Sequence, residues 1–170
     1  MFEIQVIFPI EKSLLAPYPY VASLVFLPHA VRVLGTVIAG PRVFFVLFPT
    51  ILVSGYFLFD SYVGEAHYLL IMDATIGAGC APLAYLIVKW ISNNTEEFEL
   101  TLLNWRTVLL IGAIASVLNS VARTVLISKL SLLPDIQQAI TRVFIGDMIG
   151  LAVGLVALLF AFRLALRKTI

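Results

Sequence analysis

The sequence predicts an all-α, polytopic integral membrane protein: a single transmembrane helical-bundle domain over residues 1–170, with about five transmembrane helices. Hydrophobic residues make up 61% of the chain and charged residues 12%, against about 45–50% and about 25% in soluble domains. The mean hydropathy is +1.05, and apolar stretches near the bilayer-crossing length of about 20 residues recur along the chain. The net charge of +1 creates no field that attracts phosphates, so the expected partner is the lipid bilayer and not nucleic acid.

The first two predicted spans form a helix hairpin. They run from about Tyr20 to Ala39 and from about Val43 to Phe59, with Gly40 and Pro41 between them. A connection this short makes neighbouring helices antiparallel. Residues 1–19 are apolar but interrupted by prolines and charged residues. They are predicted to be an interfacial segment, with a sixth, partial span as the alternative.

Three further spans are predicted in the rest of the chain. They cover about Ala66–Val88, Thr107–Ile127 and Val143–Phe162. Residues 91–105 form a polar loop between the third and fourth spans, and an amphipathic segment from Pro134 merges into the fifth. Residues 163–170 form a basic tail.

The basic residues predict the orientation. With a cytoplasmic C-terminus, six of them lie on the cytoplasmic side, namely Arg42, Lys89, Arg106, Arg163, Arg167 and Lys168. Three lie outside, namely Lys12, Lys129 and Arg142. Since cytoplasmic loops of membrane proteins carry the excess of Lys and Arg, the polar loop and the basic tail are predicted to be cytoplasmic.

Four charged residues fall inside predicted spans: Arg32, Asp73, Arg123 and Asp147. Each costs about 2.5–3.5 kcal/mol or more at mid-bilayer, so they should face the protein interior and be paired. His29 shares a helix face with Arg32. Asn119 lies in a polar stripe with Ser116, Ser120 and Arg123, which are spaced three and four apart.

Three interpretations of these charges stay open. The candidate ligand site, open to the outer side, comprises His29, Arg32, Asp73, Asn119, Arg123 and Asp147. The same charges could instead only lock the helix register, or His29 and the carboxylates could carry protons.

Small residues predict where helices approach closely. Gly146, Gly150 and Gly154 are spaced four apart on the fifth span, a pattern that permits close helix packing. Gly77 begins a run of small residues on the third span and is assigned the same packing role.

The sequence lacks the patterns that catalysis and metal binding need. No Ser/His/Asp or Cys/His set can be assembled at a plausible depth, neither histidine has metal-ligand spacing, and no phosphate-binding glycine loop is present. A single cysteine excludes an intrachain disulfide. We therefore predict a protein that is not an enzyme and holds no metal, and no residue pattern indicates a particular cofactor.

Several short motifs, in the same order, resemble the MASE-type membrane-associated sensor domain. They are Phe26–Gly35 with Ala39–Phe44, Asp73–Gly79, Ala115–Ser120 and Phe144–Gly150. The individual positions that match the family are Pro28, Gly40, Gly146, Asp147 and Gly150.

The resemblance implies a sensory module of the bacterial inner membrane. Such domains typically precede cytoplasmic diguanylate cyclase, phosphodiesterase or histidine kinase domains. Since these 170 residues encode no output domain, signalling is expected to pass through a partner protein. Two other interpretations remain: a substrate-capturing membrane subunit of a small-solute or vitamin importer, and a non-catalytic accessory subunit of a larger membrane complex.

Overall fold

The computed structural model describes residues 26–63, 67–92, 104–128 and 136–167. Nearly all of these residues are helical and none forms a strand, so the all-α prediction is confirmed for this part of the chain. The elements are α2 (Leu27–Ala39), a 3₁₀ turn η2 (Pro41–Val43), α3 (Phe44–Val63), α4 (His67–Ser92), α5 (Trp105–Ser128) and α6 (Ile136–Arg167).

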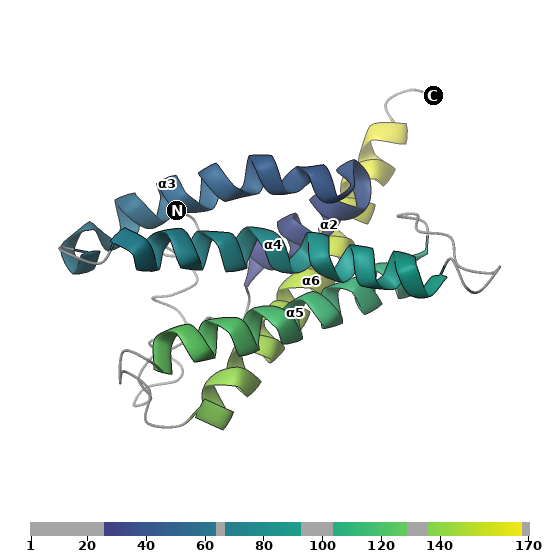
Figure 1. Cartoon of the computed structure of the whole chain (residues 1–170). Coiled ribbons are helices and arrows are strands. Elements are labelled where there is room, and N and C mark those ends of the chain that lie inside the picture. Colours follow the sequence, from purple (N-terminus) through teal and green to yellow (C-terminus); the bar gives the residue numbers. More distant parts are fainter. Residues whose placement is uncertain (1–25, 64–66, 93–103, 129–135, 168–170) are drawn as a thin grey trace.

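The helices form a bundle around α2 (Figure 1). Helix α3 packs against α4, α4 against α5, and α5 against α6, so neighbours in sequence are neighbours in space. Helix α2 contacts α4, α5 and α6. One end of the bundle holds the start of α3, the end of α4, the start of α5 and the end of α6 (Figure 1).

Three helices in the described part of the chain are long and apolar enough to cross a membrane. These spans are His67–Ser92, Trp105–Leu126 and Ile140–Ala161. Leu27–Ala39 and Pro41–Phe57 are shorter apolar helical segments. Helix α6 has 32 residues, which at 1.5 Å per residue is about 48 Å, more than the about 30 Å hydrocarbon layer.

The distribution of residue sizes is compatible with a membrane protein. Many buried positions carry small or polar side chains, among them six alanines and the serines Ser116 and Ser120. Large apolar side chains are exposed, including Phe45 at 77% and Phe57 at 82%. Small residues allow helices to approach in a membrane, where large apolar ones can face the acyl chains.

Helix α2 begins later than the sequence predicted. A continuous helix from Tyr20 was expected, but Phe26 is not helical (φ −92°, ψ 80°) and the helix starts at Leu27. Pro28 lies in the first turn, where its missing N–H costs no helical hydrogen bond. The Phe26 N–H instead donates to the carbonyl of Gly146 on α6, at 3.0 Å. The rest of the predicted start, residues 20–25, lies outside the described residues.

Other boundaries differ from the predictions at the helix ends. Helix α3 continues to Val63, and α4 and α5 extend into both ends of the predicted loop 91–105. Helix α6 joins the predicted amphipathic segment and the fifth span, and includes the first part of the predicted tail 163–170. The interfacial segment 1–19 lies outside the described residues, as do 93–103 and 168–170.

Candidate functional site

One face of α5 carries buried polar side chains that point at α6. Ser116, Asn119 and Ser120 are spaced three and four apart, so they share one side of the helix. Each is at most 1% exposed. The Ser120 hydroxyl donates to the Ser116 carbonyl within the helix at 2.7 Å, and the other two side chains reach Asp147.

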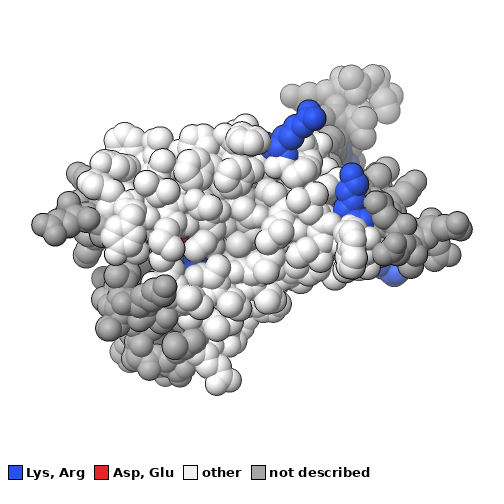
Figure 2. Space-filling view, viewed as in Figure 1, with Lys and Arg blue, Asp and Glu red and all other residues white. Residues whose placement is uncertain are grey.

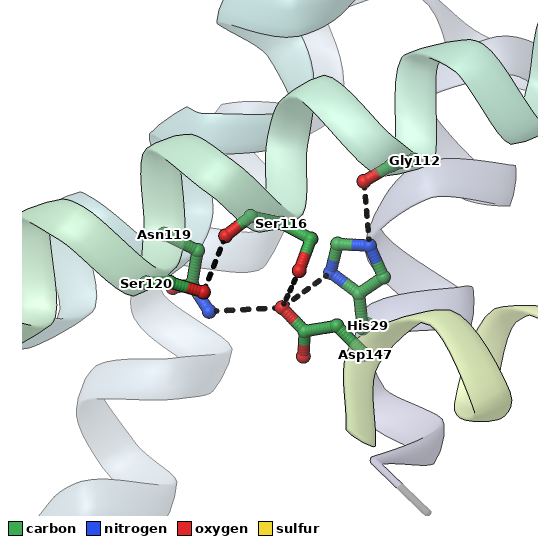
Figure 3. A network of polar contacts seen from close by, with 6 residues as sticks. All are labelled: His29, Gly112, Ser116, Asn119, Ser120 and Asp147. Atoms are coloured by element: carbon green, nitrogen blue, oxygen red, sulfur yellow. Dashed lines mark hydrogen bonds and ion pairs between the residues drawn. The ribbon is translucent and has the colours of Figure 1, made fainter. Parts of the chain in front are cut away.

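Asp147 of α6 is the acceptor on which three helices converge (Figure 3). Its Oδ2 accepts from the Ser116 hydroxyl at 2.9 Å and from the Asn119 amide at 3.3 Å. The Nδ1 atom of His29, on α2, lies 3.5 Å from the same oxygen. Asp147 is 1% exposed, and these contacts offset part of the cost of its burial. The polar network thus joins α2, α5 and α6.

His29 also contacts the backbone of α5. Its Nε2 lies 3.2 Å from the carbonyl oxygen of Gly112, and the ring is 2% exposed. The serine of the network donates to Asp147 and not to His29. This arrangement is not that of a Ser–His–Asp triad, in which the histidine accepts the proton of the serine.

Glycines of α6 bring α2 into contact with this network. A Cβ on Gly150 would overlap the Phe26 backbone, and one on Gly154 would overlap the Ala30 side chain. With the hydrogen bond from Phe26 to Gly146, these contacts place the start of α2 against the middle of α6. Non-helical backbone at membrane depth is tolerated where protein buries it, and the glycines allow that burial.

A second group of charges lies where α4, α5 and α2 approach one another. Arg123 of α5 and Asp73 of α4 form a salt bridge of 2.9 Å, with side chains 23% and 39% exposed. A Cβ on Gly77 of α4 would lie 3.5 Å from an Nη2 of both Arg123 and Arg32. Gly77 therefore leaves room for two guanidinium groups, where the sequence suggested close helix packing.

Arg32 departs from the expected pairing. It is 6% exposed, and its guanidinium lies over the Phe26 ring, 5.3 Å from the ring centroid. Within the described residues it makes no salt bridge and its guanidinium donates no hydrogen bond. The carboxylate of Asp147 is engaged by His29 and the α5 side chains.

The predicted site residues therefore lie in two groups. His29, Asn119 and Asp147 meet in the polar network, and Asp73 pairs with Arg123. Arg32 approaches Arg123 beside Gly77. No site role was predicted for Ser116, Ser120 or Gly112, although the 3–4 spacing of the polar stripe on α5 includes both serines.

Some buried polar atoms of these groups have no hydrogen-bond partner among the described residues. They include Oδ1 of Asp147, Oδ1 of Asn119 and Nε of Arg123. An unpaired buried donor or acceptor costs about 1–3 kcal/mol. The contacts of the network therefore all involve Oδ2 of Asp147. Its other oxygen, Oδ1, accepts no hydrogen bond from the described residues.

Comparison with protein-family models, curated proteins and solved structures finds no match to this chain. In the described ranges, no group of three or more His, Cys, Asp or Glu side chains is placed to hold a metal ion. The arguments for function therefore rest on the two charge groups.

Proposed function

We propose that this chain is a MASE-like sensory and ligand-binding module of the bacterial inner membrane that acts through a partner protein. The observation that carries the proposal is the contact of Asp147 with side chains of α2 and α5. Ionisable groups inside a membrane bundle are expensive and are functional candidates by default.

The proposed arrangement has five membrane-embedded helices, α2 to α6, with the C-terminus in the cytoplasm. Exposed basic side chains occur where four helices start or end at one end of the bundle: Arg42, Lys89, Arg106 and Arg163. Figure 2 agrees, since the basic atoms in view gather mainly at one end. The positive-inside rule then supports a cytoplasmic location for that end.

The proposed signal passes along α6. A ligand that alters the contacts of Asp147 changes how α6 packs against α2 and α5, because all three helices meet at that carboxylate. Helix α6 continues to Arg167, at the end of the bundle assigned to the cytoplasm. A shift of α6 would therefore be presented to a partner on that side.

The test is native purification of the full chain from its own membrane, with mass spectrometry of bound small molecules and bound proteins. Asp147→Asn and Arg123→Gln are compared with Thr75→Ala, an exposed residue whose hydroxyl bonds only within its helix. We expect the wild type and the control to retain the bound ligand or partner and the two variants to lose it.

Two outcomes would contradict the proposal. One is normal accumulation of both variants with ligand, partner and cellular response unchanged. The other is co-purification of the wild type with an energising ATPase or an electron-transfer complex. An energising ATPase as the partner would indicate an importer subunit. An electron-transfer complex as the partner would indicate an accessory subunit.

A further inference from the structure

Among the described residues, the charges of the bundle leave one cation, Arg32, without a direct hydrogen-bond acceptor. Asp73 is engaged by Arg123 at 2.9 Å, and Asp147 by His29, Ser116 and Asn119. Arg32 has only the face of Phe26 among the described side chains. A guanidinium carries five N–H donors and no acceptor, so a 94% buried Arg32 that donates none of them is an expensive group.

The guanidinium of Arg32 is directed toward a second cation. An Nη2 of Arg32 and an Nη2 of Arg123 each lie 3.5 Å from the position of a Gly77 Cβ, and the nearest other side-chain atom is Ile51 Cδ1 at 3.4 Å. The two guanidinium groups carry like charges, which repel each other in a low-dielectric interior. The Nε of Arg123 is also buried without a hydrogen-bond partner among the described residues. One nitrogen of each arginine thus lies beside the position where Gly77 carries no side chain.

We propose that Arg32 and Arg123 bind an oxyanion, a carboxylate or phosphate group, over Gly77. Guanidinium groups donate two parallel hydrogen bonds to such groups, and charge-assisted bonds of this kind are the strong ones. The anion would separate the two positive charges and supply the acceptor that Arg32 does not find among the described residues. Gly77 contributes by having no Cβ in the space between the donors.

The site reaches the surface through the Asp73–Arg123 pair. That pair is partly exposed, at 39% and 23% of its side chains. Figure 2 shows one small spot of acidic and basic atoms among uncharged residues on the face in view. The oxyanion could belong to a soluble molecule or to a phospholipid headgroup, and both present the same chemistry to Arg32 and Arg123.

This inference rests on the proposed ligand-binding function and names the class of ligand. Its test uses the purified full chain in an uncharged maltoside detergent, with thermal unfolding as the readout. At constant ionic strength the protein is titrated with inorganic phosphate, with acetate and with dioleoylphosphatidylglycerol. A ligand that binds only the folded state raises the unfolding midpoint as its concentration passes the Kd.

Two variants and a matched control make the test specific. Arg32→Gln removes one cation, and Gly77→Ala places a methyl group 3.4–3.5 Å from Ile51 and both guanidinium groups, which is ordinary contact. The control is Gly79→Ala on the same helix. Its Cβ would lie 3.9 Å from the Phe44 ring and more than 4 Å from either arginine. We expect each variant to weaken binding about tenfold or more, the range of a lost charged hydrogen bond, and the control to bind as the wild type.

The outcomes distinguish a soluble oxyanion from a lipid headgroup, and they test the anion site separately from the proposed sensory function. Stabilisation by phosphate or acetate identifies a soluble oxyanion, and stabilisation by phosphatidylglycerol alone identifies a headgroup. The inference is overturned if no probe stabilises the wild type, or if Gly77→Ala and Arg32→Gln bind as well as Gly79→Ala. An uncharged ligand that co-purifies and is retained by Gly77→Ala would leave the sensory function intact and remove only the anion site. If Asp147→Asn leaves the cellular response unchanged while Arg32→Gln abolishes anion binding, only the proposed sensory function is contradicted.

Discussion

Gly150 of α6 lies against the backbone of Phe26, the non-helical residue directly before α2. The contact is so close that a Cβ at position 150 would overlap the Phe26 carbonyl group. One turn earlier, the Gly146 carbonyl accepts the Phe26 N–H. These two contacts hold His29, three residues after Phe26, within reach of Asp147.

Replacing Gly150 with alanine should destabilise the protein. The methyl group meets backbone atoms that cannot rotate away, so we expect a loss of about 1–3 kcal/mol, the cost of overpacking a well-packed core. Thermal unfolding in lipid nanodiscs measures this loss of stability. The matched control is Gly79→Ala on α4, whose Cβ would have no neighbour closer than 3.9 Å. Equal midpoints for the two variants would show that α2 and α6 are not packed in this way.

Truncating Asp147 should cost more than truncating any of its partners. Asp147→Ala leaves the Ser116 hydroxyl, the Asn119 amide and the His29 ring without their shared acceptor. Each buried polar group that is left without its partner costs about 1–3 kcal/mol, so the loss should exceed that of a single hydrogen bond. Denaturation in lipid nanodiscs measures the change in the free energy of unfolding, with Thr75→Ala at an exposed position as the control. A loss no larger than that of the control contradicts the burial of the carboxylate.

Ser116→Ala should have an intermediate effect. It removes one hydrogen bond to Asp147 Oδ2 and leaves the contacts with Asn119 and His29 in place. The expected loss is about 1 kcal/mol, the net value of a typical hydrogen bond. The same unfolding assay reports it, and a loss as large as that of Asp147→Ala would mean that the three contacts do not act separately.

The proposed orientation predicts which positions a membrane-impermeant thiol reagent can reach. In a Cys80→Ala background, Arg42→Cys and Arg106→Cys should be labelled only after the inner membrane is permeabilised. Tyr68→Cys, exposed near the start of α4 at the opposite end of the bundle, should be labelled in intact spheroplasts. The reverse pattern of labelling would invert the topology and place the C-terminus outside.

The helices and their polar faces were predictable because they depend on local patterns. Apolar length predicted α4, α5 and α6, and 3–4 spacing placed Ser116, Asn119 and Ser120 on one face of α5. The cost of charge in a membrane predicted that Asp147 is buried, as it is, and that Asp73 and Arg123 are paired. The prediction that all of these charges face the interior is wrong for Asp73, whose side chain is 39% exposed.

The start of α2 and the partner of each charge were not predictable in the same way. The apolar pattern continues through Phe26, but α2 begins only at Leu27, and the Phe26 N–H donates to a distant carbonyl, that of Gly146. His29 contacts Asp147, and Arg32 approaches Arg123 at Gly77, because of how three helices cross. Such contacts depend on tertiary packing, about which spacing within one helix carries no information.

The most direct test of the central claim, that polar side chains of different helices meet inside the bundle, is a double-mutant cycle between His29 and Asp147. The free energies of unfolding of His29→Gln, Asp147→Asn and the double variant are measured in lipid nanodiscs. Residues in contact show a coupling energy of about 0.5–3 kcal/mol. The loss of unfolding free energy in the double variant should therefore differ from the sum of the two single losses by at least about 0.5 kcal/mol. Strict additivity of the two changes would contradict the contact and, with it, the coupling of α6 to α2.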